Sequence, residues 1–265
     1  MEEINWEELF IPYEQALDEL KVKFKNIRKE LKKRNEYSPI EFVTGRIKKI
    51  SSILDKANKL NIPFNRLDEM EDITGIRIMC QFVEDIYKVV ELIEQRDGKD
   101  MKILYVKDYI NNQKTSGYRS YHIIIRYPVQ TSQGEKEILA EIQIRTLAMN
   151  FWATIEHSLS YKYDRNIPDD IKERLRKAAE AAYLLDTEMS EIRDEIRDAQ
   201  QLFEYKSNIV SRILEGIEWL YRRGYVVESV QFQNQFRSLT SRGDVLELGK
   251  LYGRIRVQLE KLKTP

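Results

Sequence analysis

The sequence predicts an α+β fold, with strands confined to about residues 74–145 and helices on both sides of them. Two observations carry this prediction. In the middle of the chain, apolar and polar residues alternate over short segments, which is the period of a half-buried strand. Before and after that region, apolar residues recur in steps of three and four, which is typical of an amphipathic helix. Such a segregation of strands and helices indicates α+β architecture rather than a repeated βαβ fold.

The N-terminal region is predicted to form two helices. Residues 5–34 carry one apolar seam from Trp6 to Leu31, and a stripe of basic residues lies beside it. Such a stripe is most often a solvated helix face. A second helix is expected over 46–60, introduced by Ser38-Pro39.

The central region alternates between strands and helices. The predicted strands and helices follow the chain in this order: strand 74–83, helix 84–96, strands 101–109, 121–127 and 137–145, and helix 147–161. Gln133-Gly134 marks a hairpin turn between the last two strands.

The C-terminal region begins with a second apolar seam. From Ile171 to Phe203 every step is three or four residues, a coiled-coil-like spacing that also suits a long helix packed on its own domain. The seam can continue through Leu220 until Gly224 stops it. We expect residues 225–265 to form a small mixed tail with a last helix near 246–262.

Composition excludes several classes of protein. The 265 residues contain 44 basic and 44 acidic side chains, and this balance argues against a simple basic nucleic-acid coat protein. A single cysteine, Cys80, excludes a disulfide framework and a cysteine-based zinc site, and the two histidines match no HExxH motif. No run of 18 apolar residues is present, so we expect a cytoplasmic protein without a membrane partner. An enzyme built from this sequence must use carboxylates, Arg, Lys, Tyr and a hard metal ion.

The strand over 137–145 is the most informative segment. Its alternation places Glu141, Gln143 and Arg145 on one face and apolar residues on the other. That face lines either solvent or a polar cleft. Asp72 precedes the strand containing Arg77, and two carboxylates that meet across a sheet suit Mg²⁺. Taken alone, an aspartate at this position is more often a turn or cap residue than a metal ligand.

A basic cluster precedes Asp72 and is formed by Arg46, Lys48, Lys56 and Lys59. It lacks the GxxxxGK[ST] pattern of a P-loop. Scattered Arg and Lys beside a metal can still neutralise a triphosphate, although a solvent-facing helix side explains the same pattern.

The segment SGYRSYH, residues 116–122, combines a glycine with aromatic and basic residues. Gly117 permits close backbone approach, and tyrosine or arginine faces can stack on a nucleobase. Alternation places Tyr118 on the same face as His122, so we expect Tyr118 to face the cleft and Tyr121 to face the core.

These segments resemble the RelA/SpoT-type guanosine tetra- and pentaphosphate synthetases, and within that family the small alarmone synthetases of the RelQ type. The similarity covers roughly residues 5–203 and rests on five segments in the family order: SPIEFVTGRIKKISSILDKA, MEDITGIRIMCQFVEDI, SGYRSYH, GEKEILAEIQIRTLAMNFWATIEHSLSYKY and EMSEIRDEI. The resemblance implies a mixed five-stranded nucleotidyltransferase-like sheet flanked by helices. It also implies a synthetase domain over 1–203 and leaves 204–265 as a helical extension of unknown role.

The implied enzyme is a GTP diphosphokinase of the stringent response. It transfers the β,γ-pyrophosphate of ATP to the ribose 3′-OH of GDP or GTP, makes ppGpp or pppGpp and releases AMP. The resemblance assigns roles residue by residue: Asp72 and Glu141 as catalytic Mg²⁺ ligands; Arg46, Lys48, Lys56 and Arg77 to ATP; and Lys114, Tyr118, His122, Gln143, Asn150 and Glu156 to the guanine nucleotide.

Two departures and two rivals accompany this assignment. Lys107 stands where the family leads us to expect Arg, so a bidentate phosphate contact is lost there. No His-Asp pair is present, which implies synthesis without hydrolysis. The rivals are a pyrophosphokinase of the same fold that acts on adenine nucleotides or a tRNA 3′ end, and an RNA-binding module without activity.

Assembly and control complete the expectations. The two long apolar seams exceed what a small sheet domain needs, and RelQ-type relatives form homotetramers, so we expect a homo-oligomer. A cleft between subunits would suit a pppGpp effector or single-stranded RNA. The candidate effector residues are Lys21, Lys25, Arg28, Phe42 and Thr44, with 41–46 as a loop that binding would order.

Overall fold

The computed structural model describes residues 5–162, 167–242 and 244–263. Its elements in chain order are α1 (Trp6–Lys33), β1 (Phe42–Ile47), α2 (Ile50–Leu60), the 3₁₀-helix η1 (Phe64–Glu69), β2 (Thr74–Cys80), α3 (Val83–Glu94), β3 (Lys102–Asp108), β4 (Tyr121–Thr131), β5 (Gly134–Thr146), α4 (Leu147–Lys162), α5 (Asp169–Arg222), α6 (Val226–Arg242) and α7 (Val245–Lys263).

The strands form one mixed sheet in the order β1-β2-β5-β4-β3. Strands β2 and β5 are parallel, and the other neighbouring pairs are antiparallel. The predicted five-stranded sheet with flanking helices is therefore confirmed. Strand β5 lies in the centre, so its side chains can meet residues from both neighbouring strands.

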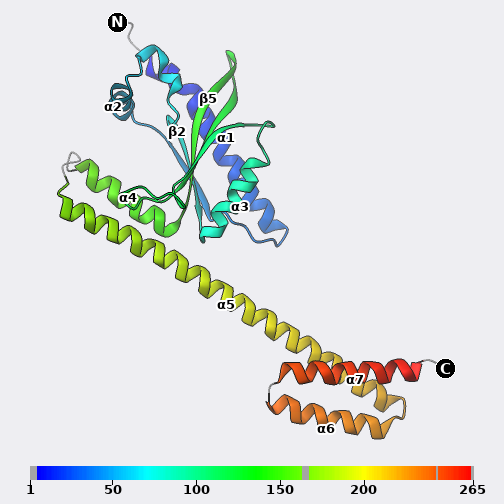
Figure 1. Cartoon of the computed structure of the whole chain (residues 1–265). Coiled ribbons are helices and arrows are strands. Elements are labelled where there is room, and N and C mark those ends of the chain that lie inside the picture. The colour runs from blue at the N-terminus through cyan, green and yellow to red at the C-terminus, as the bar shows by residue number, and fades with distance from the viewer. Residues whose placement is uncertain (1–4, 163–166, 243, 264–265) are drawn as a thin grey trace. The chain divides into compact units, whose positions relative to one another are not determined.

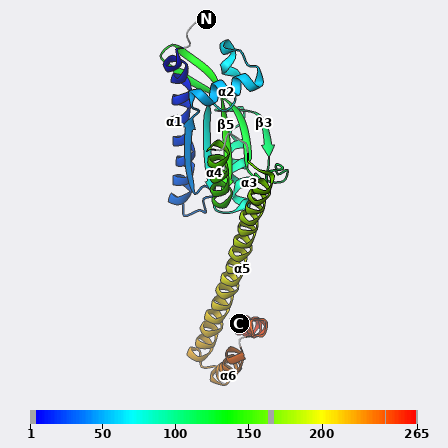
Figure 2. The same cartoon turned by 90° about the vertical axis from the view of Figure 1, so that its left-hand side faces the viewer.

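The two faces of the sheet are covered by different helices. Figures 1 and 2 show α1 and α3 on one side of the sheet and α4 on the other. Ala140, Ile142 and Ile144 of β5 belong to the buried core that includes Leu20 of α1 and Ile86 of α3. The opposite face of β5 carries its polar side chains, which therefore lie on the side of the sheet where α4 is found.

Strand β1 corrects the prediction for the N-terminal region. We expected a helix from residue 46 and a loop over 41–46, but 42–47 pair with β2 and the helix begins at Ile50. Gly45 explains part of this difference, because it lets α1 and β2 approach β1 closely. An added Cβ at Gly45 would lie 2.6 Å from Leu17 Cδ1 and 3.0 Å from the Gly75 carbonyl oxygen. Helix α1 thus lies directly over the glycine of this edge strand.

The chain divides into two compact units, Met1–Ser190 and Glu191–Pro265. The second unit has its own core, formed by Ile209, Ile213, Ile217, Leu248, Leu251 and Ile255. The expected last helix near 246–262 is confirmed by α7, but the mixed character expected for the tail is wrong, because α6 occupies the region before it. The functional division at 203/204 stays a prediction. Within the described ranges, no helix is long and apolar enough to cross a membrane.

Candidate active site

The polar face of β5 is the centre of the candidate site. Strand pairing places Gln143 opposite Arg77 of β2 on one side and His122 of β4 on the other. Lys107 of β3 is in turn opposite His122. Because directly paired residues point to the same face of a sheet, these side chains form one row across four strands. The predicted alternation of β5, with Glu141, Gln143 and Arg145 on one face, is confirmed.

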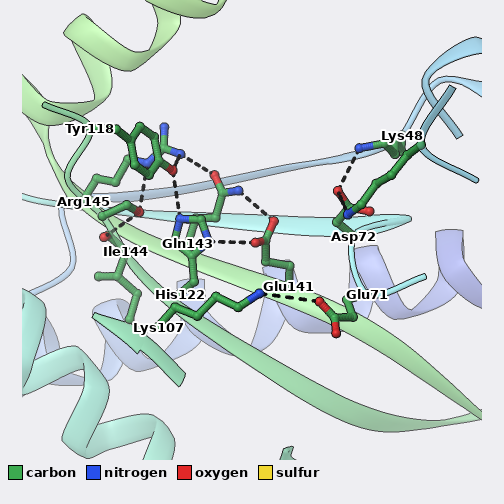
Figure 3. Close-up of polar contacts among 12 residues, drawn as sticks. Lys48, Glu71, Asp72, Lys107, Tyr118, His122, Glu141, Gln143, Ile144 and Arg145 are labelled. Carbon is green, nitrogen blue, oxygen red and sulfur yellow. Dashed lines mark hydrogen bonds and ion pairs between the residues drawn. The ribbon is translucent and has the colours of Figure 1, made fainter. Parts of the chain in front are cut away.

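Five side chains on this face form a closed ring of hydrogen bonds (Figure 3). Glu141 Oε1 lies 2.8 Å from His122 Nδ1, and its Oε2 accepts from Gln143 Nε2 at 2.8 Å. His122 Nε2 lies 2.8 Å from the Tyr118 hydroxyl. Arg145 Nη2 closes the ring by donating to Tyr118 Oη at 2.5 Å and to Gln143 Oε1 at 2.7 Å.

The ring holds Glu141 ionised beside a neutral imidazole. Burial alone would raise the pKa of Glu141, but hydrogen bonds from His122 and Gln143 and the charge of Lys56 outweigh it and lower that pKa to about 2. Burial lowers the pKa of His122; the hydrogen bond and the charge of Glu141 oppose this shift, and the charges of Arg145 and Lys114 add to it. Glu141 is therefore ionised and can serve as a ligand for a cation or accept a hydrogen bond from a hydroxyl.

Asp72, the second predicted carboxylate, lies between η1 and β2. Its Oδ2 contacts Lys48 Nζ at 2.8 Å and Lys56 Nζ at 2.9 Å, and Figure 3 shows the contact with Lys48. Its Oδ1 is buried and has no hydrogen-bond partner. Because a buried carboxylate oxygen normally has a partner, this oxygen marks a place for a cation or a donor.

The described residues contain no group of three or more His, Cys, Asp or Glu that could hold a metal ion. This finding fits Mg²⁺, which is commonly held by one or two carboxylates and completes its shell with water and substrate phosphates. The unpartnered Oδ1 of Asp72 and the ionised Glu141 are the donors available for it.

The predicted ATP residues gather around Asp72. Arg46 on β1 and Arg77 on β2 are close enough for their charges to interact, because burial and then the charges of Arg145 and Arg46 lower the pKa of Arg77. His157 of α4 belongs to the same surroundings: after burial, Arg46 is the main cause of its lowered pKa. Sequence reasoning had no role for His157, since no motif marks it.

The predicted acceptor residues surround Tyr118. Lys114 Nζ lies 4.9 Å from the centroid of the Tyr118 ring. Asn150 at the start of α4 has a buried Oδ1 without a partner. Glu156 lines a cavity of about 550 Å³ together with Ser116 of the tyrosine loop. Tyr121, in contrast, is 8% exposed and belongs to the core, as predicted.

The loop that carries Tyr118 is braced by α5, which sequence reasoning missed. Gly117 has φ +85°, and an added Cβ would lie 2.6 Å from Cβ of Ala179. Arg119 donates to Glu180 at 3.0 Å and lies over the Tyr183 ring at 4.1 Å. The heptad seam of α5 gave no signal for these contacts, because they depend on residues beside the seam.

Two further predictions concern residues at the rim. Lys107 belongs to the row of side chains across the four strands. Its Nζ lies 3.8 Å from Glu71 Oε2 and 4.9 Å from the Tyr105 ring centroid. Arg28, a candidate effector residue, instead donates to the Ile40 carbonyl at 3.1 Å and contacts Glu41 at 3.4 Å. It therefore anchors the segment leading into β1.

The other candidate effector residues are accessible. Lys25, Phe42 and Thr44 are exposed, and Lys21 makes only a local ion pair of 3.3 Å with Asp18. Phe42 and Thr44 share one face of β1 with Arg46, because alternate residues of a strand point the same way. An effector site here stays a prediction.

Comparison with known proteins identifies the class. Residues 45–166 match the family model described as a region found in RelA/SpoT proteins. The chain is 55% identical over 206 residues to GTP pyrophosphokinase YjbM of Bacillus subtilis, covering 78% of this chain and 97% of that protein. It is 39% identical to GTP pyrophosphokinase YwaC of the same organism over 195 residues, 72% of this chain and 92% of that protein.

Solved structures agree. The crystal structure of B. subtilis small alarmone synthetase 1 bound to its product pppGpp is 56% identical, with a TM-score of 0.69 over 72% of this chain and 97% of that one. The same enzyme bound to AMPCPP gives 54% identity and a TM-score of 0.65, with 73% of this chain and 98% of that one covered. The chain belongs to the RelA/SpoT family.

Proposed function

We propose that this protein is a GTP pyrophosphokinase that transfers the β,γ-pyrophosphate of ATP to the 3′-OH of GDP or GTP. The observation that carries the proposal is the connection of Tyr118 to Glu141 through His122, opposite the lysines at Asp72. Family membership and two relatives named GTP pyrophosphokinase support it. The products are AMP and ppGpp or pppGpp, and no residues for their hydrolysis are assigned.

The donor half of the site neutralises ATP. Lys48 and Lys56 are already held at Asp72, so their charges are placed where phosphates must approach. Arg46 and Arg77 hold the adenine between their guanidinium planes. Phosphoryl-type transfer depends mainly on such positioning and charge neutralisation, which the four cations supply.

Asp72 and Glu141 would hold Mg²⁺, and the unpartnered Oδ1 of Asp72 is the observation that favours it. When bound, Mg²⁺ neutralises charge on the transferred phosphates. Asp72 orients its Oδ1 toward this cation while its Oδ2 keeps the two lysines in place.

The acceptor half positions the ribose. The Tyr118 ring stacks on guanine, while Lys114, Gln143, Asn150 and Glu156 contact the rest of the nucleotide. Glu141 accepts the proton of the 3′-OH as the ribose oxygen forms its bond to the β-phosphorus. The bond between that phosphorus and the α,β-bridging oxygen breaks, and this oxygen leaves with AMP.

Assembly and location extend the proposal. We expect a cytoplasmic homotetramer whose subunit cleft takes pppGpp as an effector, or single-stranded RNA. The exposed Lys25 and Phe42 are the residues on which this expectation rests. Initial rates with and without pppGpp, for the wild type and for Lys25→Ala, test it; equal responses would exclude this stripe as the effector site.

The deciding experiment supplies ATP labelled in the β- and γ-phosphates and offers GDP, GTP, AMP or tRNA as acceptor. Label transfer to GDP or GTP with equimolar release of AMP is expected. Transfer to AMP or tRNA would assign a different acceptor to the same fold, and RNA binding without transfer in any arm would favour a module without activity.

A further inference from the structure

With His122 neutral and Glu141 ionised, the hydrogen bonds among the five side chains of the ring can run in only one direction. Arg145 can only donate, and the ionised Glu141 can only accept. The amide of Gln143 therefore turns its oxygen toward Arg145 and its nitrogen toward Glu141. The Tyr118 hydroxyl accepts from Arg145, so its own proton must go to Nε2 of His122. The hydrogen of the neutral imidazole is then on Nδ1, where it is donated to Glu141.

Arg145 is thus the common origin of two hydrogen-bonded arms that end on the two oxygens of Glu141. One arm passes through Tyr118 and His122, and the other passes through Gln143. Each intermediate residue accepts a hydrogen bond on one side and donates one on the other, so every donor in the ring faces an acceptor. Such a network orients its members more firmly than separate pairs do.

Arg145 itself is held rigidly. Its side chain is buried, with 5% of the residue exposed, and Nε donates to Ser120 Oγ at 3.1 Å. Ser120 Oγ in turn donates to the Ile144 carbonyl at 3.4 Å. Among the described residues, Arg145 makes no ion pair with a carboxylate, so its donors are directed to the ring and to Ser120.

We propose that Arg145 is a positioning residue for pyrophosphoryl transfer, which couples the acceptor platform Tyr118 to Glu141 through the two arms. The proposal rests on the proposed function, which places the acceptor base on Tyr118 and the attacking hydroxyl at Glu141. It separates two roles of Tyr118: the ring face stacks on the base, and the hydroxyl fixes His122. The sequence pattern gives the hydroxyl no role, and the ring gives it one.

The coupling has a consequence for the order of events at the site. The Tyr118 hydroxyl is committed to Arg145 and His122, so only the aromatic face is available to a nucleotide. An acceptor that stacks there meets a ring whose edge is already aligned with Glu141. The site is thus already arranged for the attacking hydroxyl before the acceptor binds, which lowers the free-energy cost of reaching the reactive geometry.

The first test measures kcat and KM for GDP and for ATP in Arg145→Gln, Arg145→Lys and Tyr118→Phe. We expect Tyr118→Phe to lower kcat about tenfold, since both hydrogen bonds of the hydroxyl are lost while the arm through Gln143 remains, and KM for GDP should stay within about twofold. Arg145→Gln should lower kcat about a hundredfold, as expected for a misplaced reacting group, with little change in either KM.

The conservative variant and the double variant identify the route. Both ring bonds come from Nη2 of Arg145, and the lysine ammonium also has several donors on one nitrogen, so Arg145→Lys should keep part of the lost kcat. The double variant Tyr118→Phe, Arg145→Gln should be no slower than Arg145→Gln alone, because both changes break the same arm. Arg126→Gln is the matched control: Arg126 lies on β4, and its side chain is 45% exposed and contacts Glu137 at 3.7 Å, away from the ring.

A second readout needs no activity. The chain has two histidines, so nitrogen NMR signals of His122 are assigned by comparison with a His157→Gln variant. At alkaline pH the wild type should show the hydrogen of His122 on Nδ1. In Tyr118→Phe or Arg145→Gln the hydrogen should stay on Nδ1, because the ionised Glu141 still accepts it there, but the Nε2 signal should shift, because the hydrogen bond from the Tyr118 hydroxyl to Nε2 is lost or weakened.

The outcomes separate this proposal from the proposed function. An unchanged Nε2 signal in both variants, or additive losses of kcat in the double variant, would overturn the coupling. A raised KM for one nucleotide at unchanged kcat would make Arg145 a direct binding residue instead. If the wild type makes no pppGpp but the Nε2 signal shifts as expected, the ring stands and the proposed reaction fails.

Discussion

The two carboxylates of the site, Asp72 and Glu141, are held in opposite ways. Both oxygens of Glu141 accept hydrogen bonds from side chains of the ring. Asp72 has two lysines on one oxygen and nothing on the other. Glu141 thus has partners within the chain for both oxygens, whereas Asp72 has a buried oxygen without a partner among the described residues. The difference indicates that the acceptor half is preorganised and that the donor half is completed by what binds there.

The two halves also differ in how the chain builds them. The acceptor half comes from consecutive strands β4 and β5 and from a loop braced by α5. The donor half combines the end of β1, helix α2 and the segment before β2. Each of the following predictions changes one half and asks whether the other half responds.

The largest effect is expected when either carboxylate loses its charge. Asp72→Asn and Glu141→Gln should each lower synthesis by about a thousandfold or more, because each removes charge stabilisation worth several kcal/mol in the transition state. The two variants should also differ in their free energy of unfolding. The amide in Glu141→Gln directs its NH₂ against one ring donor, which costs about 1–3 kcal/mol of unfolding free energy.

Thermal unfolding with and without Mg²⁺ and ATP measures both effects. The stabilisation that Mg²⁺ adds to the ATP-bound protein should disappear in Asp72→Asn. Near wild-type turnover in either variant at saturating Mg²⁺ would remove that residue from the catalytic assignment.

The sequence predicted the acceptor half better than the donor half. Alternation in β5 placed Glu141, Gln143 and Arg145 on one face, because a strand has a strict period of two. The resemblance supplied the roles of the first two residues, but Arg145 was left without one. The ring depends on donor directions between side chains from two strands and a loop, and no spacing in the sequence encodes those directions.

The misjudged elements have local causes. Strand β1 is short, contains Gly45, and runs into residues whose apolar spacing suits a helix, so the helical pattern was extended too early. At the other end, apolar residues after Gly224 were too few per turn to distinguish two helices from a mixed tail. The brace on Gly117 depends on Ala179, a small residue whose importance is visible only when the two backbones meet.

The second prediction changes the acceptor half through its brace. Gly117→Ala combines a left-handed backbone with a Cβ contact of 2.6 Å to Ala179, so we expect a loss of about 2–4 kcal/mol in unfolding free energy. KM for GDP should rise, since the Tyr118 loop must shift, while KM for ATP stays unchanged.

Gly98→Ala is the control for this change. Gly98 also has a positive φ, +68°, but an added Cβ would meet no atom within 4 Å. This variant should lose only the cost of backbone strain, about 1 kcal/mol, and keep both KM values. If the two variants affect KM for GDP equally, α5 does not brace the acceptor loop.

The third prediction concerns pH and the same brace. Asp186 of α5 accepts a hydrogen bond from Thr146 at 2.5 Å. Burial raises the pKa of Asp186 to about 6, with Glu84 adding to the shift and Thr146 and Arg119 opposing it. Because the pKa is raised in the folded state, this group stabilises the fold below about pH 4 and loses that contribution as pH rises through about 6.

Unfolding free energies of the wild type and Asp186→Asn, compared across this pH window, test the prediction. The asparagine variant keeps an acceptor for Thr146 and cannot ionise. The wild type should lose up to about 3 kcal/mol relative to the variant as pH rises, which corresponds to a shift of about two pKa units. A difference that does not change with pH would mean that folding does not shift the pKa of Asp186.

The smallest effect is expected in the donor half, from Lys56→Met. Lys56 shares Asp72 with Lys48, and its side chain is 34% exposed, so one lysine remains when the other is removed. We expect KM for ATP to rise about tenfold, equal to 1.4 kcal/mol, with KM for GDP unchanged. Lys59→Met is the matched control, because Lys59 lies on the same helix but is exposed and was part of the same predicted basic cluster. If Lys59→Met weakens ATP as much as Lys56→Met, the helix acts through its general charge, and the contact at Asp72 does not define the donor half. If Lys56→Met instead raises KM for GDP, the two carboxylates serve one shared pocket, and the contrast between the halves is lost.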